Sequence, residues 1–209
     1  NPPLGTLVSS FQELSNFIWN VCDDELRGLF KQHEYGDVIL PFVVLRRLDC
    51  VLEPEKDRVV ELWEEWKGKV DDPTPIILNQ IGLTFFNHSR YDLQRLIKDP
   101  TNIGMNLEKY LDSFSPNVRE IIENFGLDQP IQKLKKNQRL FSFVEKFTEM
   151  DFDPEVVDNH TMGQVFEELL RKFSEMSNET SGEHYTPRDV VRLLVSLVFS
   201  PDIESLKGH

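Results

Sequence analysis

Apolar residues recur at helical spacing along most of this chain, and this rhythm most constrains what it can fold into. Large apolar side chains fall three or four positions apart between residues 10 and 30, and again over 38–52 and 55–67. Beyond residue 90 the pattern returns in shorter segments, which proline, glycine, asparagine or aspartate separate. No segment alternates cleanly enough between apolar and polar residues to predict a sheet. We therefore predict a mainly α protein whose later helices cover residues 91–98, 102–114, 118–125, 131–134 and 140–150.

The segment 38–52 is expected to be the central helix, because its apolar residues cover more than one stripe of the helix surface. Pro41 is expected near the beginning of this helix, where few backbone N–H groups have partners that a proline would remove. Arg46, Arg47 and Asp49 are charged residues within the segment, and we expect them on its solvent side.

The apolar run from Ile76 to Phe86 leaves three alternatives open: a strand pair, a buried loop or a turn of helix. Asp72-Pro73 and Thr74-Pro75 precede it, and a residue before proline is disfavoured in a helix. We favour irregular structure with at most a short hairpin, because the surrounding segments offer no sheet to join.

The charge balance argues against direct contact with nucleic acid. The chain has 36 acidic and 23 basic residues, a net charge of −13. Binding to a phosphate backbone depends on clustered Lys and Arg that release counterions, so we expect poor binding of duplex DNA. One local run is basic, and a solvated helix face is a better interpretation of it than a phosphate-binding track. This run comprises Lys133, Lys135, Lys136 and Arg139.

Cys22 and Cys50 are the only cysteines, and their apolar helical surroundings predict buried free thiols. No apolar run approaches the roughly 20 residues that span a bilayer, and the sequence shows no signal peptide. We expect a cytoplasmic protein without membrane contact. His33, Glu34 and Asp37 are conceivable metal ligands, but one histidine and two carboxylates in a turn are more often solvated, so no metal site is expected.

The most informative stretch runs from Thr161 to Phe199. An amphipathic helix is followed by a polar hinge over Ser174–Gly182 and by a second helix that starts at Thr186-Pro187. A helix N-terminus carries partial positive charge and free N–H groups, so it can hold an anion. Thr186 adds a hydroxyl, and Tyr185 adds an aromatic face beside it. The alternative is a cap that only stabilises the helix, by about 1 kcal/mol.

Two stretches resemble the adenine-specific DNA methyltransferase subunit, or modification subunit, of type I restriction-modification systems. LLRKFSEMSNETSGEHYTPRDVVRLLV resembles the start of its catalytic domain, and NFIWNVCDDELRGLF with YGDVILPFVVLRRL resembles its helical N-terminal domain. In that family a Gly-x-x-Tyr/Phe-Thr-Pro element lines the pocket for S-adenosylmethionine. The resemblance therefore implies cofactor contacts at Glu183, His184, Tyr185, Thr186, Pro187 and Arg188.

The same resemblance implies a compact multi-helix N-terminal domain over residues 1–160 and the helical start of an α/β methyltransferase domain over residues 161–209. The whole enzyme would transfer a methyl group from S-adenosylmethionine to the amino group of adenine in DNA. Its partners would be a specificity subunit, a second methyltransferase subunit and a restriction subunit, with DNA bound in the full complex.

No catalytic residue is expected in this chain. In the family, a glycine-rich loop and an Asn/Asp-Pro-Pro-aromatic motif follow the Tyr-Thr-Pro helix, and the chain ends before either. Asn1-Pro2-Pro3 imitates the second motif, but Leu4 stands where the aromatic residue would be. We therefore expect the chain to be inactive alone. The alternative from another class of function is a stand-alone helical interaction module without catalysis.

Overall fold

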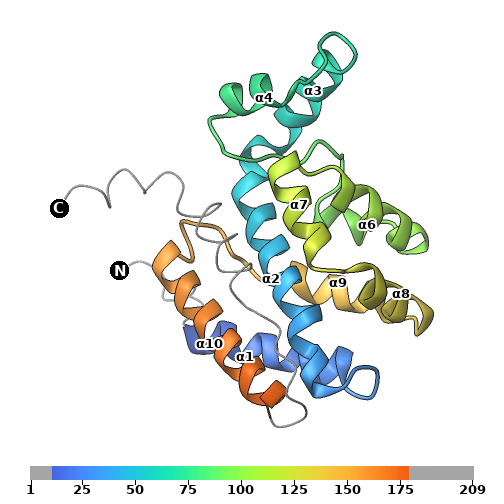
Figure 1. Ribbon diagram of the computed structural model, residues 1–209, viewed down its shortest axis with the longest axis vertical. Coiled ribbons are helices and arrows are strands. Elements are labelled where there is room, and N and C mark those ends of the chain that lie inside the picture. The colour runs from blue at the N-terminus through green and yellow to red at the C-terminus, as the bar shows by residue number, and fades with distance from the viewer. Residues whose placement is uncertain (1–10, 179–209) are drawn as a thin grey trace, which may run out of the picture.

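The structure is a computed structural model, and it describes residues 11–178. Within this range no β-strand occurs and the regular elements are helical, which confirms the mainly α fold (Figure 1). None of the helices described is long and apolar enough to cross a membrane. The α-helices are α1 (Phe11–Val21), α2 (Tyr35–Leu52), α3 (Lys56–Trp66), α4 (Thr74–Ile81), α5 (Leu93–Leu96), α6 (Ile103–Asp112), α7 (Pro116–Asn124), α8 (Asp128–Lys136), α9 (Leu140–Thr148) and α10 (Asn159–Asn178). The shorter turns are the π-helical η1 (Cys22–Leu26) and the 3-10 turns η2 (Gln32–Glu34), η3 (Glu53–Glu55) and η4 (Pro100–Asn102).

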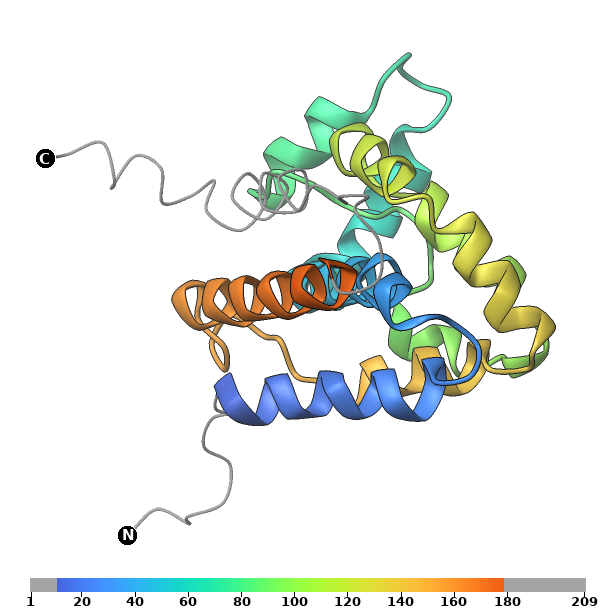
Figure 2. The same ribbon diagram turned by 60° about the horizontal axis from the view of Figure 1, so that its bottom comes forward.

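The central element is α2, and all of its residues except Asp37 and Val51 are buried. α9 packs against it, where the ring of Phe42 lies 4.8 Å from that of Phe143 in an edge-on arrangement. α10 also packs against α2, and it runs alongside α1 (Figure 2). These contacts confirm that the segment around residues 38–52 is the centre of the helical assembly.

Helix α2 begins earlier than the sequence predicted. The turn η2 leads directly into it, and the Glu34 carboxylate stabilises that turn by accepting the backbone N–H of Lys31 at 2.6 Å. Pro41 therefore lies in the second turn of α2 rather than near its beginning, so this prediction is wrong. A proline there has no N–H to donate to the carbonyl of Asp37, which is one of the two residues of α2 that are not buried.

Residues 74–81 form a helix, so the preference for irregular structure over 76–86 is wrong for much of that run. Pro75 occupies one of the first positions of α4, where its missing N–H has no partner to lose. Gly82 ends the helix in the left-handed conformation, with φ at 68°. α3 and α4 pack together as an α3–α4 hairpin, seen at the top of Figure 1. Its core is separate from the main one and consists of Val59, Leu62, Ile77, Ile81 and Phe86.

α10 extends farther than predicted. It covers Asn159–Asn178, so Ser174 to Asn178 continue the helix instead of opening a hinge. Arg171 supports these turns, because it pairs with Glu168 at 2.9 Å and with Glu175 at 2.5 Å, one helical turn before and after it. The rest of the predicted hinge lies outside the described residues.

The cysteines are buried free thiols, as predicted. Cys22 and Cys50 both lie in the interior and form no disulfide. Burial raises the pKa of the Cys50 thiol to about 11, so this thiol stays protonated at neutral pH and is unreactive.

Candidate functional site

The residues predicted to contact a cofactor lie outside the described residues, as does the rest of the chain after Asn178. Their contact with a cofactor therefore stays a prediction. The helix that precedes them in the chain is α10, and the structure shows how that helix is held. The predicted cofactor residues are Glu183, His184, Tyr185, Thr186, Pro187 and Arg188.

α10 is held against the rest of the molecule by an apolar face, in agreement with the amphipathic pattern of its sequence. The ring of Phe173 lies 5.0 Å from that of Trp19 in α1, and Lys172 places its ammonium group 5.1 Å from the Trp19 ring centre. Phe173 also approaches α2 at Gly36, where an added Cβ would lie 3.2 Å from the Phe173 side chain. The buried residues of this face share one core with α1 and α2, and they include Val165, Phe166, Leu169 and Phe173.

The connector between α9 and α10, residues 149–158, is fixed by arginine side chains of α2. Nη1 of Arg47 donates to the carbonyl of Phe152 and, at 2.8 Å, to that of Val157. Its Nη2 donates to the Asn159 side-chain oxygen at 2.9 Å, at the first residue of α10. One guanidinium therefore holds two points of the connector and the beginning of the helix that follows it.

Arg46 makes a similar bond near the start of the connector, where its Nε donates to the carbonyl of Met150 at 2.7 Å. The prediction that Arg46 and Arg47 face solvent is wrong, because the two residues are 7% and 0% exposed. The physical reason is that buried carbonyls outside regular structure need donors. A signal was present in the sequence: apolar residues on more than one stripe of segment 38–52 leave little of the helix surface for solvent.

Arg47 is a buried cation whose two terminal nitrogens donate to carbonyl and amide oxygens. Burial lowers its pKa, while the nearby carboxylates of Asp153 and Asp158 act in the opposite direction. Arginine remains charged even so. Its Nε finds no hydrogen-bond partner within residues 11–178.

A second cluster of buried polar residues joins α2 to α3, α6 and the loop before α5. Asp49, also predicted on the solvent side of α2, is buried instead, and its carboxylate accepts the Tyr110 hydroxyl and the backbone N–H of Leu93, each at 2.7 Å. Lys56 donates to the side-chain oxygen of Asn87 at 3.0 Å. The Asn87 side chain donates in turn to the carbonyl of Tyr110 at 2.8 Å. These bonds pin the loop between α4 and α5 to the body.

Burial governs how this polar group titrates. It raises the pKa of Asp49 to about 6, although hydrogen bonds from Leu93 and Tyr110 act to lower it. Burial also lowers the pKa of Lys56 to about 8. Shifts of this kind are typical of active sites, but the cavity beside Asp49 and Lys56 measures only about 40 Å³. Since that is room for about one water molecule, the group is a polar joint of the fold and not a substrate site.

His88 lies where the α3–α4 hairpin meets the body. Its ring stacks on that of Trp63, with 3.8 Å between the ring centres and 7° between the planes. Burial lowers the pKa of His88 to about 4, and the positive charge of Lys56 adds to the shift. His88 is therefore neutral at neutral pH and serves as a packing contact.

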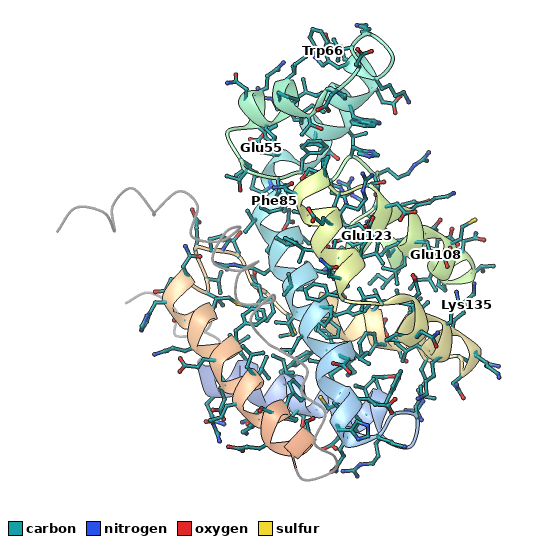
Figure 3. The ribbon with its side chains drawn as sticks, viewed as in Figure 1. Glu55, Trp66, Phe85, Glu108, Glu123 and Lys135 are labelled. Carbon is teal, nitrogen blue, oxygen red and sulfur yellow. The ribbon has the colours of Figure 1, made fainter. Side chains whose placement is uncertain are left out.

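Two larger clefts open beside α8. One, of about 640 Å³, is lined by Phe30 and Phe125 and by Glu34 and Lys133, which pair at 3.8 Å. The other, of about 370 Å³, lies between α6, α7 and α8 (Figure 3). The charged lining of this second cleft is mostly acidic, with Glu108, Asp112, Glu123 and Asp128 beside Arg119.

No group of three or more His, Cys, Asp or Glu side chains that could hold a metal ion occurs in the described part of the chain.

The basic run at α8 does not form a continuous anion-binding track. Lys133 pairs with Glu34, and Arg139 donates to the main-chain carbonyls of Asp24 and Glu25 at 2.8 and 3.2 Å. Both cations are thus engaged within the molecule. The exposed members of the run are Lys135 and Lys136.

The family of the chain follows from its match to known domains. Residues 14–147, which hold α2 to α8 with most of α1 and α9, match the family described as HsdM N-terminal domain. The chain therefore belongs to the methylase subunits of type I restriction-modification systems, of which it is an N-terminal portion. Residues 157–207, which include α10, match a second family, described as N-6 DNA Methylase.

One curated relative is the type I restriction enzyme MjaIX methylase subunit of Methanocaldococcus jannaschii. It is 23% identical over 202 residues, which cover 89% of this chain and 35% of that protein. The chain thus spans about a third of the length of this relative. No solved structure matches the chain.

Proposed function

We propose that this chain belongs to a modification subunit that transfers a methyl group from S-adenosylmethionine to the amino group of adenine in DNA. The observation that carries the proposal is the order of the two family matches, at residues 14–147 and 157–207. α10 lies in the second match and packs on helices of the first. A helical domain and the beginning of an N-6 DNA methylase therefore meet in one chain.

We divide the chain into a helical domain over residues 1–160 and the start of the methyltransferase domain over residues 161–209. The proposed cofactor is S-adenosylmethionine, and the segment from Glu183 to Arg188 is assigned as one wall of its pocket. Thr186 is central to this assignment, because a hydroxyl can accept an N–H of its own helix and still donate to the methionine carboxylate. The partial positive charge of a helix N-terminus favours that carboxylate as well.

The proposed partners are a specificity subunit, a second methyltransferase subunit and a restriction subunit, in a cytoplasmic complex on DNA. Because of its net charge of −13 and the acidic cleft beside α8, this portion should bind the phosphate backbone of DNA poorly. We therefore assign to it closure of the complex around DNA and contacts with other subunits. Most contacts with the DNA backbone then fall to other parts of the assembly.

Titration of the complete subunit with S-adenosylmethionine tests the assignment of Thr186. Thr186→Val removes both hydrogen-bonding roles, so we expect cofactor binding to weaken by about 1 to 3 kcal/mol, whereas Thr186→Ser should bind nearly as wild type does. Calorimetry gives the affinities, and melting curves of the same variants measure any loss of capping. Wild-type affinity in the Val variant, together with a lower melting temperature, would leave Thr186 with a capping role only.

A methyl-transfer assay on adenine-containing DNA, with the complete subunit and its specificity subunit, tests the activity itself. We expect transfer to DNA that carries the target site and none by residues 1–209 alone. The alternative of a stand-alone interaction module predicts neither cofactor binding nor methyl transfer by the complete gene product.

A further inference from the structure

The connector separates the two family matches in the sequence, yet the elements on either side of it are packed together. The first match ends at residue 147 and the second begins at residue 157. Met162, Val165 and Leu169, beyond the connector, lie in the same hydrophobic core as α1 and α2. The boundary between the sequence families therefore falls inside a single packed body.

The connector has little regular structure of its own. Its backbone hydrogen bonds include those from the N–H groups of Val156 and Val157 to the carbonyl of Asp153, at 3.0 and 2.8 Å. The Phe152 and Val157 side chains are buried and anchor it in the main core. The carbonyls of Met150, Phe152 and Val157, however, point to α2 and would be left unpaired if α2 carried apolar residues at positions 46 and 47.

We propose that Arg46 and Arg47 act as a clamp that makes the helical domain and α10 one rigid body. Arg47 is the positioning residue, because its guanidinium bonds to Phe152, Val157 and Asn159 from the central helix. If the proposed function holds, a methyltransferase domain can move relative to the helical domain only through residues beyond α10. The connector, where the sequence families divide, is not the hinge.

The chemistry of arginine suits this task. Its guanidinium is planar, presents several N–H donors in a fixed fork and keeps its charge when buried. A lysine at position 47 offers one ammonium group on a flexible stem, which cannot reproduce a fork shared among three acceptors. Loss of the clamp therefore loosens the connector before it loosens the helices around it.

Hydrogen exchange of the full chain tests the clamp. In Arg47→Met, we expect the amides of Val156, Val157 and Met162 to exchange about tenfold faster than in the wild type. Amides in α4, whose buried residues belong to the separate core of the α3–α4 hairpin, should keep their wild-type rates. Arg171→Met is the matched control, because Arg171 is an exposed arginine of α10 whose partners are on the same helix.

Asn159→Ala provides a milder test that leaves Arg47 in place. It removes one acceptor of Arg47, while Asp158 still caps α10 by accepting the N–H of Thr161 at 2.7 Å. We expect the same connector amides to exchange faster, by less than in Arg47→Met. If Arg47→Met does not fold, the exchange rates of the same amides in Asn159→Ala and Arg47→Lys test the clamp instead. Wild-type exchange of the connector amides in the folded variants overturns the clamp.

Spin labels test the rigid body. Glu145→Cys in α9 and Glu167→Cys in α10 place both labels on exposed positions, while the native thiols are buried. Pulsed electron paramagnetic resonance should give one narrow distance distribution, in the chain alone and in the complete subunit with S-adenosylmethionine. A second distance population, or a shift on adding S-adenosylmethionine, overturns the rigid body. Neither measurement needs methyl transfer, so an inactive enzyme would refute the proposed function and leave the clamp standing.

Discussion

Tyr110→Phe should destabilise the protein more near neutral pH than in mild acid. Tyr110 is fully buried, and its hydroxyl donates to the Asp49 carboxylate at 2.7 Å. The substitution keeps the ring, which packs edge-on against Phe114 at 5.1 Å between the ring centres. The substitution therefore removes only the hydrogen bond between the Tyr110 hydroxyl and the Asp49 carboxylate. Since this hydrogen bond helps to lower the pKa of Asp49, its loss should raise that pKa above the wild-type value of about 6.

The magnitude follows from the position of that pKa. At about pH 5 the Asp49 carboxyl is mostly protonated in the folded protein, so the variant loses a neutral hydrogen bond worth about 1 kcal/mol. At about pH 7 the carboxylate loses a stronger, charge-assisted bond, but it can take up a proton instead, at a cost of about 1.4 kcal/mol for one pH unit. The loss at about pH 7 should therefore be about 1 to 2.5 kcal/mol.

The direction of the pH dependence is fixed by proton linkage. The pKa of Asp49 in the folded protein lies above its ordinary value of 3.8, so the folded state binds the proton more tightly than the unfolded chain does. This group thus favours folding at low pH, and its contribution is lost as the pH rises through the folded pKa. Tyr110→Phe widens the difference between the pKa of Asp49 in the folded protein and its pKa in the unfolded chain.

Urea unfolding at the two pH values, followed by circular dichroism, gives the free energies from the midpoint and slope. Tyr91→Phe is the matched control, because the Tyr91 side chain is half-buried and its hydroxyl makes no hydrogen bond among the described residues. Its free energy of unfolding should stay within about 0.5 kcal/mol of wild type. An equal loss for Tyr110→Phe at both pH values, or a larger loss in acid, would refute the reasoning.

Gly163→Ala and Gly36→Ala should have opposite effects on the free energy of unfolding in urea. A methyl group at Gly163 meets nothing within 4 Å and should stabilise α10 by about 0.5 to 1 kcal/mol, whereas at Gly36 it presses on Phe173 at 3.2 Å and should destabilise the fold. His88 should titrate near pH 4 by nuclear magnetic resonance, and a midpoint near its ordinary pKa of 6.5 would show that it is not buried against Trp63. Because that pKa is lowered by burial, the contribution of His88 to stability should decline as the pH falls from 6.5 toward 4. The isolated chain, with its charge of −13, should bind duplex DNA negligibly at about 0.15 M salt, and sub-micromolar affinity by fluorescence anisotropy would contradict this.

The helices could be predicted from spacing because each buries an apolar stripe that its own sequence displays. Val59 and Leu62 of α3 and Val165 and Leu169 of α10 are buried as their positions indicate. The ends of the helices were harder to predict, because they depend on local hydrogen bonds such as the one between Glu34 and Lys31.

The buried charges could not be predicted, because their partners are distant in the sequence. Asp49 is stabilised by the hydroxyl of Tyr110, 61 positions away, and Arg47 by the carbonyl of Phe152, 105 positions away. The sequence of a helix does not show which distant hydrogen-bond donors and acceptors will pack against it in the fold. The cofactor contact of the segment from Glu183 to Arg188 is the opposite case, because a hexapeptide that resembles a family element is enough to suggest it. It stays a prediction, since the segment lies outside the described residues.

The α3–α4 hairpin, with its separate core, is a part of the molecule in which the chain length can vary. The loop at its tip lies between Trp66 and Thr74, and Gly68, Lys69 and Asp71 in it are exposed. This tip points away from α1 and α10 (Figure 1). Residues inserted there would lengthen a surface loop without changing the main core or the connector. Related subunits can therefore diverge in size at this tip, and it is a suitable place for an affinity tag or a fluorescent label.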